Sequence, residues 1–418
     1  MVEIRKPIQV AEAVERVMSH VHKLGTEMLL LEDTYGRVLA EPIIAKHDVP
    51  PFDRSPYDGF AIRAADSAGA SGDARKSFQV IGEIGAGHVA DRSIEEGESY
   101  RIMTGALIPE QADAVVMLEQ TVENEKGFTL RKPFEAGENI SRQGEDAKKG
   151  ERLIEAGTVI HPGTIALLAT FGYSQVRVAK RPIAGVLSTG TELLDVADEL
   201  VPGKIRNSNG PMIRAQLTRM GVESKSYGMM EDDLDACTEI VERALQEMDF
   251  LITTGGVSVG DYDYLPAIYE RLGAEVLFNK VAMRPGSVTT VAVLGEKLLF
   301  GLSGNPSACF TGFELFTRPA ILSMMGCVAP FMPQIQAKLG DDFKKANPFT
   351  RFVRASWSMT SEGIVATPAG FNKSSAVSSI ARGNCIIVLP SGTRGFEKGM
   401  TVDVLLLGAE QGVERWEL

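Results

Sequence analysis

The chain has few cysteines, few histidines and no long apolar run, and each shortage excludes a class of protein. Its four cysteines are far apart in 418 residues and form no C-x-x-C pair, which favours buried thiols in a reducing cytoplasm over disulfides or a zinc site. The five histidines show no metal-ligand spacing. No run of about 18 apolar residues and no signal-like N-terminus is present. We therefore expect a cytoplasmic protein without a membrane span.

Positive charge is also scarce. The net charge is -12 and the sequence contains no lysine or arginine run, which argues against nucleic-acid and anionic-membrane partners. Local positive groups must therefore meet any anionic substrate. The hydrophobic share of 44% and the charged share of 23% are ordinary for a globular protein, and the length predicts two to four domains.

The most informative stretch is DFLITTGGVSVGDYDY, residues 249–264. Residues 250–254 are apolar and β-branched, as in a buried strand, and a glycine-rich turn follows before a predicted helix over 264–272. A strand, a glycine-rich turn and a helix N-terminus together bind anions through free backbone N–H groups. The acidic residues Asp261 and Asp263 suit such a site when a metal ion lies between them and the ligand. A plain βα turn with two capping carboxylates is the alternative.

Strands and helices alternate between residues 181 and 329. This rhythm predicts a doubly wound parallel sheet, in which ligands bind at the carboxyl ends of the strands. We therefore expect five loops to gather at one sheet edge, with the sequences STGTE, MMEDD, TTGGVSVGDYD, KVAMRPGS and LSGNP.

The rest of the chain divides around this segment. An apolar stripe over 10–24 predicts a first helix, and short strands over 46–139 predict an inserted, mostly-β domain. Residues 1–45 and 140–180 then form one discontinuous domain, and residues 330–418, without a helical pattern, form a β-barrel or sandwich. The fold class is thus α/β multidomain. Asp58 in the inserted segment is either a turn aspartate or a site residue, and Thr104 follows a strand end.

Several motifs occur together in the order that is typical of a known protein family. They are SPYDGFA, RIMTGA, STGTEL, NSNG, TTGGVSVGDYDY, RPGS, GLSGNPSACF and RGNCIIVLP. With them the chain resembles, over essentially its whole length, the molybdopterin molybdenumtransferase family, the MoeA type that also forms the C-terminal domain of gephyrin. The resemblance implies an elongated first domain, an inserted β domain, a molybdopterin-binding α/β domain and a C-terminal β-barrel. It also implies a homodimer that takes adenylylated molybdopterin and molybdate, releases AMP with Mg²⁺ and leaves molybdenum on the dithiolene.

The resemblance assigns roles to individual residues. Carboxylates would bind Mg²⁺ or polarise water near the pyrophosphate: Asp58, Glu192, Asp232, Asp263 and, more weakly, Asp146, with Glu192, Asp232 and Asp263 as the metal ligands. Thr104 would position substrate from the partner subunit. Residues of the strand-end loops would bind the pterin and its phosphate: Ser208, Gly255, Gly256, Ser258, Ser303 and Gly304. Positive and hydroxyl groups would hold molybdate or phosphate: Lys280, Arg284, Arg354, Ser378 and Ser379.

The sequence departs from the family pattern at three positions. Arg284 stands where lysine is common, Ser287 replaces another lysine, and Ser303 replaces the proline of L-P-G-N-P. Arginine keeps the charge and adds a fork that can clamp an oxyanion, whereas Ser287 loses a charge and Ser303 is expected to relax its loop.

Two other functions are compatible with this fold. One is a dimeric scaffold that keeps the fold without the chemistry, and the other is a molybdopterin adenylylating enzyme. The complete carboxylate set favours the transferase over the scaffold, and the extra domains argue against the adenylylating enzyme. Other proteins of molybdenum cofactor biosynthesis are expected partners.

Overall fold

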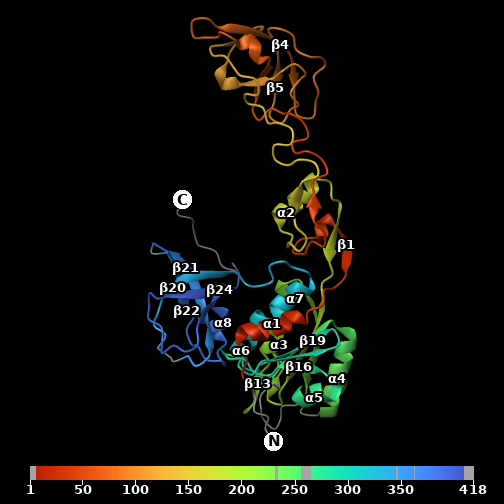
Figure 1. Ribbon diagram of the computed structural model, residues 1–418, viewed down its shortest axis with the longest axis vertical. Helices are drawn as coiled ribbons and strands as arrows, with labels where there is room; N and C mark the ends of the chain where they lie inside the picture. Colours follow the sequence, from red (N-terminus) through yellow and green to blue (C-terminus); the bar gives the residue numbers. More distant parts are fainter. Residues whose placement is uncertain (1–5, 231–233, 256–264, 345–346, 362, 409–418) are drawn as a thin grey trace. The chain divides into compact units, whose positions relative to one another are not determined.

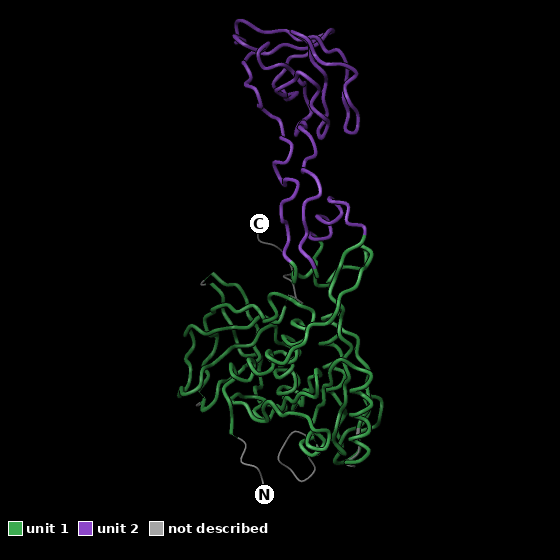
Figure 2. Tube along the Cα trace, turned by 45° about the vertical axis from the view of Figure 1, so that its right-hand side comes forward, with its two compact units in different colours: residues 1–40, 156–162, 175–418 green, residues 41–155, 163–174 purple. Residues whose placement is uncertain are grey.

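The computed structural model describes residues 6–230, 234–255, 265–344, 347–361 and 363–408 (Figure 1). The chain forms two compact units, residues 1–40, 156–162 and 175–418, and residues 41–155 and 163–174 (Figure 2). The boundaries of the four-part division predicted above stay a prediction. Among the described residues, no helix is long and apolar enough to cross a bilayer.

The first unit is built around a six-stranded sheet. Its strand order is β14-β11-β15-β19-β18-β16, with bounds β11 (Ile183–Thr189), β14 (Glu223–Met230), β15 (Phe250–Thr254), β16 (Glu275–Phe278), β18 (Thr290–Leu294) and β19 (Lys297–Leu302). The first four strands of this order are mutually parallel, which confirms the α/β architecture that the alternation predicts.

One strand of the sheet, β18, departs from the parallel arrangement that the alternation predicts. This strand runs antiparallel to both β19 and β16. The reason is the two-residue connection Gly295-Glu296 to β19, in which Gly295 has φ +60. A connection this short closes a hairpin, and a hairpin forces antiparallel pairing.

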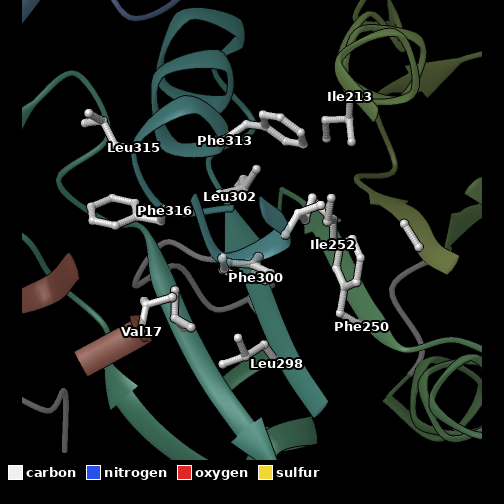
Figure 3. Close-up of a cluster of buried hydrophobic side chains, with 14 of the residues drawn as sticks. Val17, Ile213, Phe250, Ile252, Leu298, Phe300, Leu302, Phe313, Leu315 and Phe316 are labelled. Atoms are coloured by element: carbon white, nitrogen blue, oxygen red, sulfur yellow. The ribbon is translucent and has the colours of Figure 1, made fainter. Parts of the chain in front are cut away.

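Helices cover both faces of this sheet because its central strands are apolar on both sides. On one face, Phe250, Phe300 and Leu302 pack with Phe313 and Phe316 (Figure 3). On the other face, Leu251 and Leu299 pack against two helices. The helices are α3 (Asn209–Arg219), α4 (Leu234–Glu247), α5 (Leu265–Leu272), α6 (Pro306–Gly312), the π-helical segment η4 (Phe313–Thr317) and α7 (Arg318–Met324).

The N-terminal helix is shorter than the apolar stripe predicts. Helix α1 (Val10–Ser19) ends before Val21 and Leu24, which nevertheless pack against the same core. The N–H of Leu24 donates to the carbonyl of Met324, 2.9 Å away, so the chain already follows a different path there. It continues into β1 (Thr26–Leu30), which pairs with β10 (Gln175–Ala179). The short helix η1 (Leu31–Asp33) follows β1. Two further strands of two residues each, β12 (Leu193–Leu194) and β13 (Ile205–Arg206), lie later in the chain.

The C-terminal part of the first unit is a closed five-stranded barrel. Each barrel strand pairs with two others, and the strands are β20 (Gln334–Leu339), β21 (Thr350–Thr360), β22 (Gly363–Pro368), β23 (Cys385–Leu389) and β24 (Thr401–Leu406). The barrel confirms the expected C-terminal β-barrel. The expectation of no helix was wrong at one turn, α8 (Ser378–Ala381).

A sixth strand joins this barrel from the α/β part. Strand β17 (Met283–Arg284) lies in the connection between β16 and β18, and it pairs in parallel with the start of β21. In addition, the N–H of Ser307, at the start of α6, donates to the carbonyl of Ser374 over 3.0 Å. These contacts fix the barrel against the loops at the sheet edge.

The second unit is mostly β, as expected for the inserted segment. Its sheet has the order β6-β3-β5-β4-β8-β7, with bounds β3 (Gly59–Ile62), β4 (Lys76–Ile84), β5 (Glu98–Ile102), β6 (Ala114–Met117), β7 (Val122–Asn124) and β8 (Gly127–Leu130). One face packs around stacked Phe60, Phe78 and Phe128. The remaining elements are β2 (Ile43–Ile44), β9 (Arg152–Ile154), α2 (Pro162–Thr170), η2 (Ala64–Ser67) and η3 (Leu118–Gln120).

Candidate functional site

Four of the five expected loops begin at one edge of the α/β sheet. Strands β11, β15 and β19 end in register, with Ser188 beside Thr254 and Thr254 beside Leu302. Strand β14 ends next to Thr189. The loops that begin at Gly190, Gly255 and Ser303 therefore start from neighbouring strand ends. Gly256, Ser258 and Asp263, and likewise Asp232, lie outside the described residues.

Gly255 brings two of these loops into close approach. Its φ is +89, and a Cβ there would lie 2.3 Å from the carbonyl oxygen of Thr189. A Cβ at Gly304 would lie 3.5 Å from the Cα of Gly255. Only glycine combines this backbone conformation with this spacing, so the predicted ligand residues Gly255 and Gly304 lie against each other.

Asn209 joins the same loops from the first turn of α3. Its amide nitrogen donates to the Thr254 hydroxyl and to the Gly304 carbonyl, each over 2.8 Å. The side chain is 7% exposed, and its amide oxygen is buried without a hydrogen-bond partner in the described structure. The predictions named the preceding residue, Ser208, which is exposed. They missed Asn209, although it stands in the quoted NSNG motif.

Of the three predicted metal ligands, only Glu192 is described. Its side chain is exposed, and its carboxylate lies back over its own loop, since a Cβ at Gly190 would be 2.6 Å from Oε2. No group of three or more potential metal ligands occurs among the described residues. The metal role of Glu192, Asp232 and Asp263 therefore stays a prediction.

A cavity of about 500 Å³ lies between these loops and the barrel. The α/β part contributes the segment from Arg284 to Val288 together with Ser303, Asn305 and Ala308, and the barrel contributes residues 351–354 and 372–375. Four side chains in the lining are cationic: Arg284, Arg351, Arg354 and Lys373. None of the described lining residues is acidic. The cavity is therefore a positive region in an acidic protein, suited to a small oxyanion.

Arg354 is the deepest of these cations. It is 2% exposed, and burial lowers the pKa of its guanidinium to about 10, so it stays charged at neutral pH. Its Nε donates to the Ser379 hydroxyl over 3.0 Å, and Nη2 donates to the Lys373 carbonyl over 3.3 Å. Both partners are neutral. The charge of Arg354 therefore remains available for an anion in the cavity.

The other residues predicted to hold the oxyanion do not all line the cavity. Arg284 and Ser287 line the cavity, whereas Lys280 and Ser378 are not among its lining residues. The structure places Ser379, rather than Ser378, against Arg354. The Ser303 hydroxyl accepts a hydrogen bond from the N–H of Asn305, 3.2 Å away, and Ser303 is 5% exposed. Its effect on the loop stays a prediction.

In the second unit, the structure brings Asp58 and Thr104 together. Strands β3 and β5 pair with Gly59 beside Ile102. The N–H of Thr104 donates to the Asp58 carboxylate over 2.7 Å, and its hydroxyl donates over 2.9 Å. These two bonds, the backbone one first, lower the pKa of Asp58 below its ordinary value. Asp58 is thus an exposed, ionised carboxylate held in a fixed position. Thr104 also lines a hollow of about 540 Å³.

Comparison with known proteins decides the family. Three family models match in sequence order: the MoeA N-terminal region (domain I and II) over residues 8–172, a probable molybdopterin binding domain over 185–323, and the MoeA C-terminal region (domain IV) over 336–407. A molybdopterin molybdenumtransferase of Staphylococcus aureus (strain COL) is 55% identical over 414 residues, 99% of each chain. The chain belongs to the molybdopterin molybdenumtransferase family.

Further relatives agree with this assignment. A molybdopterin molybdenumtransferase of Staphylococcus epidermidis (strain ATCC 12228 / FDA PCI 1200) is 54% identical over 405 residues, 97% of each chain. The crystal structure of a molybdopterin biosynthesis MoeA protein from Pyrococcus horikoshii OT3 has 29% identity and a TM-score of 0.83, with 96% of this chain and 100% of that chain covered. The resemblance stated from the motifs is confirmed.

The sequence of this family member did not lead us to predict several of the residues that line the cavity. Arg351, Asn372 and Lys373 line the cavity, yet none stands in a quoted motif. Side chains alternate along a strand, so the spacing of Arg351 and Arg354, three residues apart, does not by itself indicate a shared cavity. A cluster of basic residues in the barrel segment is the one signal that could have indicated Arg351.

Proposed function

We propose that the chain transfers molybdenum from molybdate to adenylylated molybdopterin, with release of AMP. One observation carries this proposal: a cavity whose described lining holds four cationic and no acidic side chains adjoins the strand-end loops of a domain that matches the molybdopterin-binding model. The loop 303–305 belongs to both places, since Ser303 and Asn305 line the cavity and Gly304 is held by Asn209 at the strand ends. A pterin at the strand ends and an oxyanion in the cavity would therefore be neighbours.

Different residues would bind the pterin and the molybdate. Backbone N–H groups of the glycine-rich loops would take the phosphates of the pterin, as loops at strand ends do in α/β domains. Arg354 and Arg284 would hold molybdate by charge-assisted hydrogen bonds. Fixing both reactants in one place favours transfer of the metal to the dithiolene sulfurs over reaction in solution. Hydrolysis of the phosphoanhydride, with water as the nucleophile, then yields AMP and the molybdopterin phosphate.

Incubation of the pure protein with adenylylated molybdopterin, Mg²⁺ and molybdate tests this proposal. We expect AMP and molybdenum-loaded cofactor to accumulate over many turnovers. Absence of both products would contradict the transferase activity and would favour the non-catalytic scaffold. Formation of adenylylated molybdopterin from ATP would instead identify an adenylylating enzyme. Neither alternative is favoured, because the relatives that match the whole chain are named transferases.

We further propose that Mg²⁺ takes part, held by Glu192, Asp232 and Asp263. Hard carboxylate oxygens suit this ion, and bound Mg²⁺ would neutralise charge on the pyrophosphate. The exposed Glu192 carboxylate, which lies back over Gly190 at a strand end, is consistent with this role.

AMP release is expected to stop in EDTA and to return with added Mg²⁺. The Glu192→Gln variant should need roughly tenfold more Mg²⁺ for half-maximal rate, because one anionic ligand is lost. Glu199→Gln, an exposed change in the same connection, serves as the control. The rate would be followed as AMP released against Mg²⁺ concentration. Full activity in EDTA would exclude the metal role.

We also propose a cytoplasmic homodimer in which Asp58 and Thr104 complete the partner's site. The resemblance implies this arrangement, and the four cysteines, which form no disulfide with one another, suit a reducing compartment. Mixed dimers test it, because an Asp58→Ala chain and an Arg354→Ala chain together contain one site with neither change. We expect each variant alone to be nearly inactive and the hybrid to regain up to half of the wild-type activity per dimer. Purified hybrids with no regained activity would assign both residues to the same chain.

A further inference from the structure

Two arginines from different parts of the chain meet where β17 joins the barrel. In the parallel pairing of β17 with β21, Arg284 is the register partner of Arg351. Register partners on adjacent strands project from the same face of a sheet. Both residues line the 500 Å³ cavity. The pairing therefore places Arg284 and Arg351 side by side at its wall, while Ser287 on the same wall contributes no charge.

Arg351 is held in place at its base. Its Nε donates to the Asn347 side-chain oxygen over 2.7 Å, and its guanidinium carbon lies 5.2 Å from the centre of the Phe343 ring. Asn347 is itself 1% exposed, and its N–H donates to the Thr393 carbonyl over 2.9 Å. Because these contacts fix the stem and Nε, the terminal nitrogens of Arg351 keep a defined orientation, which lowers the entropy cost of binding.

The two arginines have no acidic partner among the described residues that line the cavity. Burial, and after it the charge of Arg284, lowers the pKa of Arg351 below its ordinary value. No acidic residue occurs among the described lining residues, and the hydrogen-bond acceptor on Arg351 is a neutral amide. Two like charges held at one wall disfavour each other. A divalent oxyanion between them would remove this penalty and gain charge-assisted hydrogen bonds.

We propose that Arg351 and Arg284 form a two-arginine clamp for the oxyanion substrate, with Arg351 as a direct binding residue. This inference deepens the proposed function, on which it rests for the identity of the anion as molybdate. Arg354 holds the anion from the interior of the cavity, and the clamp holds it from the β17–β21 wall. The clamp follows from a strand pairing between the α/β part and the barrel, so it forms only when the two are docked.

Binding of molybdate in the absence of pterin, measured by calorimetry, tests the clamp directly. Arg351→Gln is expected to weaken binding about tenfold or more, since a charged hydrogen bond is lost. Arg351→Lys keeps the charge and the stem but not the fork, so a loss of about threefold is expected. Lys338→Gln removes the same charge from an exposed position of the barrel and should leave binding unchanged. In turnover, Arg351→Gln should raise the half-saturating molybdate concentration and leave that of the pterin nearly constant.

The outcomes separate this inference from the proposed function. A wild-type protein that binds molybdate but inserts none, with weak binding in Arg351→Gln, would support the clamp and overturn the function. Normal insertion with an unchanged molybdate requirement in Arg351→Gln would overturn the clamp and leave the function standing. A lower melting temperature in both Arg351 variants at unchanged molybdate affinity would give Arg351 a purely structural role and overturn the clamp. Absence of molybdate binding by the wild type at millimolar concentrations would overturn it as well.

Discussion

Replacement of Arg354 by alanine is expected to lower kcat/KM for molybdate by roughly 100-fold or more. The guanidinium is 2% exposed and is hydrogen-bonded only to neutral groups in the described structure. It therefore offers a desolvated positive charge to the bound anion. Loss of charge-assisted hydrogen bonds in such a place costs about 3 kcal/mol, a factor of about 100. Steady-state rates at varied molybdate, with the pterin saturating, measure this directly.

Two companion variants separate the charge from the packing. Arg354→Lys keeps the charge and should recover part of the molybdate affinity, although it cannot donate to Ser379 and the anion with one fixed fork. Ser379→Ala removes only the neutral partner of Nε and should cost far less than Arg354→Ala. Equal losses in kcat/KM for the pterin and for molybdate would mean that Arg354 stabilises the barrel and does not bind the anion.

The second large effect is expected for Gly255→Ala. The new Cβ would lie 2.3 Å from the Thr189 carbonyl oxygen, in a residue with φ +89. The backbone conformation alone costs about 1–2 kcal/mol for alanine, and the overlap forces the loops after β11 and β15 apart. We expect the free energy of unfolding to fall by about 3 kcal/mol or more, and pterin binding to be lost. Urea unfolding and fluorescence titration with the pterin give the two quantities.

Gly295→Ala is the matched control for this change. Gly295 also has a positive φ, +60, but a Cβ there would meet nothing within 4 Å, and it connects β18 and β19 of the same sheet. It should show the backbone penalty of about 1–2 kcal/mol with unchanged pterin binding. Equal effects of the two substitutions would mean that the close approach of Gly255 to Thr189 is not needed for pterin binding.

The sequence allowed prediction of the site's pterin side because strand direction determines where loops gather. An apolar run such as residues 250–254, followed by glycines, indicates a buried strand and its carboxyl end. Parallel strands then bring the loops at Gly190, Gly255 and Ser303 to one edge without any knowledge of strand order. The position of Asn209 at that edge follows from the same rule. Its bonds to Thr254 and Gly304 depend on side-chain geometry, which a motif does not specify.

The oxyanion side was predictable only in part. Arg284 and Arg354 came from the resemblance, but their meeting depends on β17 leaving the α/β connection to pair with the barrel. A two-residue strand has no periodicity to detect. The pairing of Arg351 with Arg284 was missed for this reason. The contact of Asp58 with Thr104 similarly requires the pairing of β3 with β5, whose strands are separated along the chain by β4.

The central claim is that this one protein couples AMP release to molybdenum insertion at adjoining sites. A single-turnover measurement tests it most directly, with enzyme in excess over adenylylated molybdopterin, Mg²⁺ present, and molybdate added or omitted. The account predicts one AMP released and one molybdenum bound per pterin when molybdate is present, with molybdenum loading lost in Arg354→Ala. Release of AMP at the same rate and extent with no molybdenum retained on the pterin, in the presence of saturating molybdate, would contradict it.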